Sequence, residues 1–330
     1  MPASPERLHV TNGDAAAERI VEAGVGGIVL PWRDALHEGP VPAGLSLDAL
    51  TTVRADFIGR AGWDDPETAL SRLRWRDAML SGCRAYVEVV LWFEHDLYDQ
   101  LQLLQVLDWF STVDAGPVRL SLINPGEFLG MQSGQRMRER FAARRVVTPE
   151  VLNLAATIWG EFRAPDPLPL ADRARVPHAA LPHLAGALAR LLAEYPGTDD
   201  GLSRTERQIL EALADGPLTS GQLFRAAHLD REGAAFLGDL VFDWQVARLA
   251  DATVPPLRFR DEGRTEAEVT AAGQDALAGR FDHVEVNGVD RWVGGVHLEG
   301  RSVPWRWSPT GENFWHNNIP RKCTTTGRAR

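Results

Sequence analysis

The chain has 330 residues, of which 44% are hydrophobic and 24% charged, and its formal net charge is −10. This length and composition predict two or three globular domains. The acidic balance argues against a surface built to coat nucleic acid or an anionic membrane, because such polyanions are bound by clustered basic residues.

Lysine and cysteine are nearly absent, and each scarcity excludes a class of site. The single lysine is Lys322, so the body of the chain can form neither a Walker-type phosphate loop nor a pyridoxal phosphate (PLP) Schiff base. Cys83 and Cys323 are too few for a Cys-rich zinc site or a disulfide framework. With no signal peptide visible and no apolar run of about 18 residues, the sequence predicts a soluble, cytoplasmic protein.

Short β-like runs alternate with helix-like segments over residues 1–132, which predicts an α/β domain with a mostly parallel, Rossmann-like sheet and flanking helices. The expected strands are Leu8–Thr11, Gly27–Pro31, Tyr86–Phe93 and Val118–Ile123. The expected helices are Ala15–Ala23, Leu47–Arg60, Pro66–Leu80 and Asp96–Phe110. The glutamines of the last helix, Gln100, Gln102 and Gln105, are expected to be solvated or to cap it.

Residues 133–198 read as a helical extension that ends in a linker, Tyr195–Gly201, rich in turn formers and acids. Residues 199–282 predict a winged-helix-like domain. Its expected elements are a helix over Gln208–Leu213 headed by the capping box Ser203–Glu206, helices Thr219–His228 and Gly233–Leu249, strands Leu257–Arg260 and Glu268–Thr270, and a closing helix entered along Val269–Leu277. The helix Gly233–Leu249 is expected to bury Phe236, Leu240 and Trp244.

Residues 283–330 predict a β-hairpin and a tail. Asn287-Gly288 follows the β-like run Val284–Val286, and Asn-Gly favours a two-residue hairpin turn because both positions tolerate positive φ.

Polar residues follow each of the first four predicted strands. They are Asn12, Gly13 and Asp14 after the first, Trp32, Arg33, Asp34, His37 and Glu38 after the second, Glu94, His95 and Asp96 after the third, and Asn124 after the fourth. Because the carboxyl ends of parallel strands meet at one edge of the sheet, we expect these residues to line one crevice.

Residue type assigns a role to each member of this set. The candidate ligands of a divalent cation, Mg²⁺ or Mn²⁺, are the carboxylates Asp14, Asp34, Glu94 and Asp96. The candidate acids and bases are His37, Glu38 and His95. The candidate substrate-binding residues are Asn12, Gly13, Trp32, Arg33 and Asn124.

Two structural alternatives stay open at this stage. Asp14 and Asp96 could be plain N-caps of the helices that follow them, and Arg33 could form a structural ion pair with Glu94 or Asp96. Crowded carboxylates repel one another, so a cation or Arg33 must compensate them unless some point away. A Rossmann-type dinucleotide is not expected, because the turn after the first strand lacks the second and third glycines of the fingerprint.

Three stretches, His9–Asp14, Pro31–Val41 and Leu91–Leu104, resemble the bacterial family grouped as domain of unknown function 1835. Residues Asp290–His297 are similar to a segment of its longer members. The resemblance supports the outline of the first domain and brings no established activity with it.

Two functions fit these features. The first is an enzyme, a hydrolase or transferase, that acts on a phosphorylated or nucleotide-like small substrate through the carboxylates and histidines. The alternative is a ligand-sensing regulator whose winged helix binds DNA or a partner protein. DNA is the less expected partner, because acids surround the wing arginines Arg258, Arg260 and Arg264.

Overall fold

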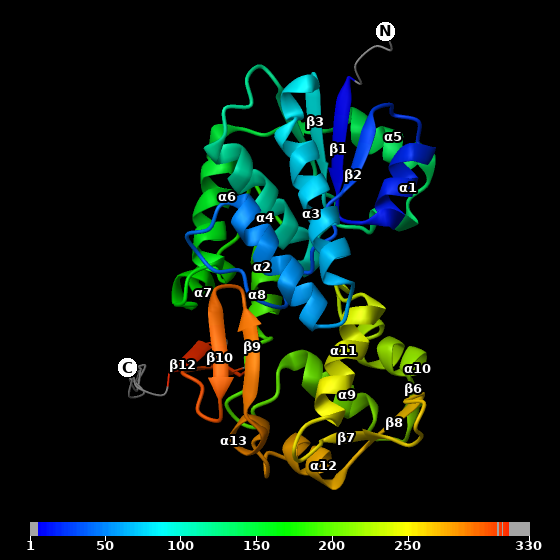
Figure 1. The fold of residues 1–330 in the computed structure, drawn as a ribbon, viewed down its shortest axis with the longest axis vertical. Coiled ribbons are helices and arrows are strands. Elements are labelled where there is room, and N and C mark those ends of the chain that lie inside the picture. The colour runs from blue at the N-terminus through cyan, green and yellow to red at the C-terminus, as the bar shows by residue number, and fades with distance from the viewer. Residues whose placement is uncertain (1–5, 309, 312, 317–330) are drawn as a thin grey trace, which may run out of the picture. The chain divides into compact units, whose positions relative to one another are not determined.

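The computed structural model describes residues 6–308, 310, 311 and 313–316 (Figure 1). It divides the chain into two compact units. Unit 1 comprises Met1–Leu191, Glu232–Trp244 and Trp292–His297, and unit 2 comprises Leu192–Arg231, Gln245–Arg291 and Leu298–Arg330. Within the described part of the chain, no helix combines the length and the apolar character needed to cross a bilayer.

Unit 1 is a mixed α/β structure around a mostly parallel five-stranded sheet. The strands are β1 (Arg7–Thr11), β2 (Ile28–Pro31), β3 (Glu88–Trp92), β4 (Arg119–Ile123) and β5 (Arg145–Val146), in the order β2-β1-β3-β4-β5. The first four pair in parallel, and His9 of β1 lies beside Val29 and Val90. The four predicted strands are therefore confirmed. The antiparallel edge strand β5 was not predicted, since its two exposed residues carry no pattern.

Helices cover both sides of this sheet, and further helices of the unit pack on those helices. They are α1 (Asp14–Glu22), α2 (Leu47–Arg60), α3 (Pro66–Ser81), α4 (Leu97–Thr112), α5 (Gly134–Ala142), α6 (Pro149–Phe162), α7 (Leu168–Ala174) and α8 (Leu184–Leu192), with short 3₁₀ turns at Cys83–Ala85 and Leu129–Met131. In Figure 1, α1 and α5 lie on one side of the strands and α3 and α4 on the other. Ile20 of α1 and Met137 of α5 pack with Trp92 of β3 in one apolar cluster.

The helix starts follow from local chemistry. Ser46 accepts a hydrogen bond from the Ala49 amide at the head of α2, and Asp65 accepts one from Thr68 at the head of α3. Pro66 suits the first position of α3, where an amide hydrogen has no partner within the helix. These signals explain why the sequence predicts the starts of both helices correctly.

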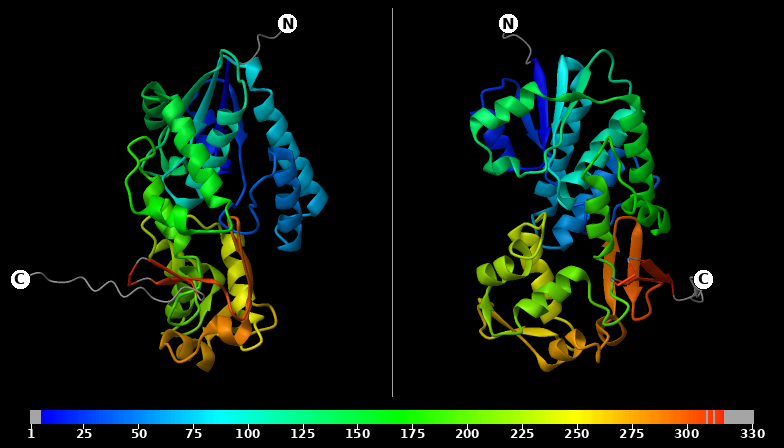
Figure 2. Two further views of the ribbon diagram at one scale, coloured as in Figure 1. Left: turned by 90° about the vertical axis from the view of Figure 1, so that its left-hand side faces the viewer. Right: turned by 180° about the vertical axis from the view of Figure 1, so that it is seen from behind.

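Unit 2 combines helices with small antiparallel sheets (Figure 2). Its region of the chain contains α9 (Arg204–Ala212), β6 (Leu218–Thr219), α10 (Ser220–Phe224), a π-helical turn (Arg225–Leu229), α11 (Asp239–Ala250), β7 (Leu257–Phe259), β8 (Glu266–Val269), α12 (Ala271–Leu277), α13 (His283–Asn287) and the strands β9 (Val289–Val293), β10 (Val296–Gly300), β11 (Trp305–Ser308) and β12 (Asn313–His316). The division between the units passes through α8, α11, β9 and β10. The sheet β6-β8-β7 is antiparallel, and the predicted capping box of Ser203 and Glu206 heads α9.

The expected helix Gly233–Leu249 is wrong in its first six residues. Residues 233–238 are not helical, and the helix α11 begins only at Asp239. Phe236 is buried as expected but lies outside the helix, whereas Leu240 is 51% exposed and Trp244 is half-buried. The burial pattern predicted for this segment therefore holds only in part.

The hairpin expected within residues 283–330 is present as β9 and β10, but its turn was wrongly placed at Asn287-Gly288. Residues His283–Asn287 form the helix α13, capped by Asp282, and Gly288 ends it with a φ of +76°. The turn between β9 and β10 is at Gly294-Gly295 instead, and a Cβ on Gly294 would lie 2.3 Å from the Phe162 carbonyl oxygen. Asn287-Gly288 and Gly294-Gly295 both suit a turn, so local sequence cannot rank them, and the close approach to Phe162 requires a glycine at position 294.

The segment Tyr195–Gly201 does not behave as a solvated linker. The Tyr195 side chain is buried, and the buried Asp200 carboxylate forms an ion pair with Arg207. The polar composition of the segment reflects these internal contacts. Lys322 and Cys323 lie outside the described residues.

Candidate functional site

The strand order places one point of unit 1 where a ligand crevice is expected. The chain leaves β1 for β2 on one side and leaves β3 for β4 on the other, so the loops diverge between β1 and β3. In doubly wound sheets, ligands bind outside the carboxyl ends of the strands at this switch point. Asn12 follows β1 there, and Glu94 and Asp96 follow β3.

Three carboxylates meet at this switch point: Glu94, Asp96 and Asp99, here called the carboxylate trio. One oxygen of each lies within 4.8 Å of one oxygen of the other two, and all three side chains are buried. The sequence brings them together locally, because Asp96 is the N-cap of α4 and accepts a hydrogen bond of 3.1 Å from the Asp99 amide.

Hydrogen bonds fix the orientation of the trio. Asn12 donates through Nδ2 to Oδ2 of Asp99 at 2.7 Å, and Oδ1 of Asp99 accepts from the Glu94 amide. Oε1 of Glu94 accepts from the Leu129 amide at 2.6 Å. Because each of these bonds uses one lone pair of an ionised carboxylate, further lone pairs remain for another partner.

The charges of the trio are not compensated by basic side chains. No salt bridge among the described residues involves Glu94, Asp96 or Asp99. Burial, together with the Asp96 charge, raises the pKa of Glu94 to about 7, and burial raises the pKa of Asp96 to about 7. Burial and the two neighbouring carboxylates also raise the pKa of Asp99. The trio therefore requires either protons or a cation near neutral pH.

Two further oxygens beside the trio have no partner. The side-chain amides of Gln100 and Asn124 both donate to the Glu94 carbonyl oxygen, at 2.5 and 3.1 Å. The side-chain oxygens, Oε1 of Gln100 and Oδ1 of Asn124, are buried and accept no hydrogen bond from any described residue. Carboxylate and amide oxygens are hard ligands of the kind that Mg²⁺ and Mn²⁺ prefer. The trio is thus a group that could hold a metal ion.

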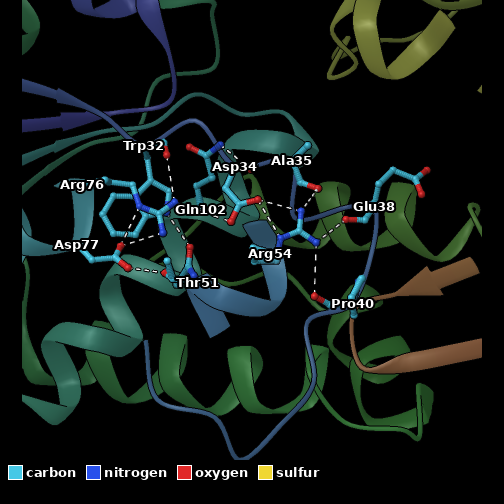
Figure 3. Close-up of polar contacts among 11 residues, drawn as sticks. Trp32, Asp34, Ala35, Glu38, Pro40, Thr51, Arg54, Arg76, Asp77 and Gln102 are labelled. Atoms are coloured by element: carbon cyan, nitrogen blue, oxygen red, sulfur yellow. Dashed lines mark hydrogen bonds and ion pairs between the residues drawn. The ribbon is translucent and has the colours of Figure 1, made fainter. Parts of the chain in front are cut away.

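Asp34, predicted as a metal ligand, belongs to a different cluster (Figure 3). Arg54 donates to Oδ1 of Asp34 through Nε and Nη2, at 3.0 and 2.9 Å, and Arg76 lies 3.8 Å from Oδ2. Both arginines and Asp34 are almost fully buried. Asp34 already has its counter-charges, so the metal assignment of this residue is corrected to a structural one.

Arg54 also organises the loop that follows β2. Figure 3 shows its guanidinium directed at backbone oxygens of Ala35, Glu38 and Pro40, to which it donates at 3.0, 2.7 and 3.4 Å. Five hydrogen bonds from one buried side chain hold this loop in a single conformation.

Trp32 was predicted as a stacking surface for a ligand, and this prediction needs correction. The side chain is 1% exposed, Nε1 donates to Gln105 at 2.7 Å, and the Arg76 guanidinium lies 4.0 Å from the ring centre. The ring face that would stack on a ligand is occupied by Arg76.

Asp14 and Arg33 pair with each other on the surface. Asp14 is the first residue of α1 and forms an ion pair with Arg33, whose φ is +50°. Arg33 therefore does not pair with Glu94 or Asp96, as one alternative proposed, and Asp14 lies outside the trio. Gly13 has an extended backbone and open space where a Cβ would stand, so no close approach requires a glycine there.

The three predicted acids and bases lie in two environments. His37 and Glu38 are buried, and the His37 ring packs 5.1 Å from that of Phe236. His95 is half-buried, and its Nδ1 has no hydrogen-bond partner among the described residues. Burial and the nearby His183, 5.9 Å away between ring centres, lower the pKa of His95.

Sequence reasoning missed Asp99 as a candidate ligand and the glutamines of α4 as partners. Gln100, Gln102 and Gln105 are all buried, not solvated as expected. Gln102 donates to the Asp34 carbonyl oxygen at 2.9 Å, and all three glutamines bind the segments after β2 and β3. The signal available in the sequence was the position of the three glutamines on different faces of the leucine-rich helix α4. Amides on several faces of a leucine-rich helix indicate a helix buried all round.

No protein-family model matches the chain, and a search of curated proteins found no match. The resemblance to the domain of unknown function 1835 stays a prediction.

Proposed function

We propose that unit 1 is a divalent-cation-dependent enzyme, a hydrolase or transferase, acting on a phosphorylated or nucleotide-like small substrate. The observation that carries this proposal is the carboxylate trio, which is buried at the switch point of the sheet without a basic partner among the described residues. In the loop after β2 the fold supplies Asp34 with two arginines, whereas the trio has no such counter-charge among the described residues.

In this proposal Glu94, Asp96 and Asp99 hold Mg²⁺ or Mn²⁺, and Asn12 orients Asp99. A cation bound to so few protein carboxylates keeps open positions, in which it would polarise a phosphoryl oxygen of the substrate. The N-terminus of α4 begins beside the trio, and its first-turn amides already bind Asp96.

His95 is the proposed general acid or base. It lies between two members of the trio in the sequence and its ring is partly exposed, so the ring can take or give a proton; Nδ1 itself is buried and has no hydrogen-bond partner among the described residues. The lowered pKa keeps the ring neutral near pH 7, which suits a base that activates water or a hydroxyl group. His37 and Glu38 are buried in the loop held by Arg54, so we assign them no contact with substrate.

A titration with Mn²⁺, followed by electron paramagnetic resonance of the free ion, tests the metal step. We expect one bound Mn²⁺ per chain and binding at least tenfold weaker in Asp96→Asn and Asp99→Asn. Asp14→Asn removes an equivalent charge outside the trio and should bind like the wild type. Equal binding by all four proteins would refute the site.

Phosphate release from a panel of phosphorylated compounds, with Mn²⁺ or with a chelator, tests the reaction. Activity should need the cation, and His95→Gln should lower the rate constant without weakening Mn²⁺ binding. Activity that survives both the chelator and Asp96→Asn would refute the enzyme proposal while leaving any metal binding intact.

We also propose that residues 199–282 form a winged-helix-like domain whose partner is not DNA. Its support is the chain order helix, strand, two helices and two strands, with the sheet order β6-β8-β7. The wing arginines carry ion pairs with nearby acids: Arg258 with Glu268, Arg260 with Glu266 and Arg264 with Asp251. Fluorescence anisotropy with duplex DNA at physiological salt should detect no tight binding; a dissociation constant on the order of nanomolar would overturn this.

A further inference from the structure

A cavity of about 580 Å³ lies within unit 2 and shares no residue with the carboxylate trio. Its wall is formed by the start of α9, the end of α11, α13, the start of β9 and the end of β10. Small-molecule sites commonly measure about 300–1,000 Å³. The cavity is therefore large enough for a metabolite-sized ligand.

The acids on the cavity wall are already engaged by the protein. Their partners are Arg291 for Glu194, the Ser203 amide for Glu206 and Arg264 for Asp251, and Asp290 and Glu299 also interact with other groups. The first of these is a buried ion pair of 2.7 Å. Each acid of the wall thus has at least one interaction partner, and Glu194 and Asp251 are paired with arginines.

Arg301 differs from the other charged residues of the wall. Within the described ranges it has no hydrogen-bond or ion-pair partner, whereas Arg248 donates to the Asp290 carbonyl oxygen at 2.9 Å. Cγ of Arg301 lies 3.6 Å from the point where Gly288 would carry a Cβ. The stem of the exposed Arg301 therefore packs beside a glycine, and Arg301 is the arginine of the described wall whose guanidinium has no partner.

His283 supplies a defined hydrogen-bond donor to the same wall. The Asn287 amide is oriented by Val254, whose amide donates to Oδ1 at 2.7 Å and whose carbonyl oxygen accepts from Nδ2 at 3.1 Å. The second hydrogen of that Nδ2 then points to Nδ1 of His283, 3.1 Å away. Nδ1 must accept, so the ring hydrogen is on Nε2, for which no acceptor exists among the described residues.

We propose that this cavity binds a small organic anion. Its carboxylate or phosphate pairs with the Arg301 guanidinium, and a second polar group accepts from the Nε2 hydrogen of His283. The planar guanidinium donates two parallel hydrogen bonds to either anion, which is the strong form of such a contact. An anion fits better than a cation, because the acids of the wall have partners and Arg301 has none.

Isothermal titration calorimetry at constant ionic strength, with a chelator present, tests this proposal. The probes are inorganic phosphate and succinate, which separate a phosphate site from a carboxylate site. We expect saturable binding of at least one probe with one site per chain, and protection of the α13 amides from hydrogen exchange on binding.

Arg301→Gln should weaken that binding about tenfold or more, since a charge-assisted hydrogen bond is lost. Arg225→Gln removes an exposed positive charge of unit 2 that does not line the cavity and should bind like the wild type. Asp96→Asn should also leave it unchanged. The proposal is overturned by the absence of saturable binding of either probe up to tens of millimolar, or by equal weakening in Arg301→Gln and Arg225→Gln.

Discussion

Glu88→Gln and Glu94→Gln make the same chemical change near the two ends of β3, and we expect opposite effects on the free energy of unfolding. Although burial alone would raise the pKa of Glu88, hydrogen bonds from Arg144 and Ser121 lower it to about 2. Burial and the Asp96 charge instead raise the pKa of Glu94 to about 7. One carboxylate is stabilised as an anion by its partners, and the other is not.

The size and sign of each effect follow from proton linkage. The Glu94 pKa moves from 4.5 to about 7 on folding, which corresponds to about 3 kcal/mol. The folded state holds this proton more tightly, so the contribution is complete below pH 4.5 and is lost as pH rises through about 7. For Glu88 the contribution of similar size is present above pH 4.5 and is lost as pH falls through about 2.

At about pH 8, Glu94→Gln should therefore raise the free energy of unfolding by up to about 3 kcal/mol, and Glu88→Gln should lower it by about 3 kcal/mol. The glutamine at position 94 can still accept from the Leu129 amide, so that hydrogen bond is kept. In Glu94→Gln, the stability lost by the wild type between about pH 5 and pH 8 should be much reduced.

Urea denaturation with a chelator, followed by tryptophan fluorescence, measures these differences. Adding Mn²⁺ at about 100 times its dissociation constant should then stabilise the wild type by about 2.7 kcal/mol and leave Glu94→Gln unchanged. A decrease in stability of Glu94→Gln at about pH 8, like that of Glu88→Gln, would refute the claim that the trio is uncompensated.

Three further substitutions separate structural from functional charges. Arg54→Met should lower the free energy of unfolding by about 3–5 kcal/mol in urea denaturation, since it leaves Asp34 without its main counter-charge; a neutral result would contradict the buried ion pair. Asp14→Asn breaks only an exposed pair with Arg33 and should cost less than about 1 kcal/mol in the same assay. Ser203→Ala should cost about 1 kcal/mol through the lost cap of α9, and no change in the urea midpoint would contradict that role.

The sequence predicts much of unit 1 because its signals there are local. The span Leu47–Arg60 coincides with α2, whose start is set by the cap at Ser46. The run that became β3 is buried on both faces, as expected for a central parallel strand. Where a long-range contact decides, as at Gly294 against Phe162, the local turn signal misplaced the hairpin.

The partners of the charged residues could not be predicted in the same way. Asp34 and Asp96 both follow the carboxyl end of a strand and look equivalent in the sequence. Arg54 and Arg76, which neutralise Asp34, come from α2 and α3, and nothing in their spacing says which acid they face. The difference between a structural and an available carboxylate therefore depends on how helices pack against the sheet.

Asp96 was open to two interpretations, an N-cap or a metal ligand, and these do not exclude each other. Capping uses Oδ1, which accepts from the Asp99 amide, and a carboxylate has a second oxygen. Asparagine caps a helix about as well as aspartate but carries no charge. Asp96→Asn should accordingly keep α4 intact, relieve the repulsion with Glu94 and weaken Mn²⁺ binding at least tenfold, whereas unchanged Mn²⁺ binding would indicate that Asp96 serves the helix alone.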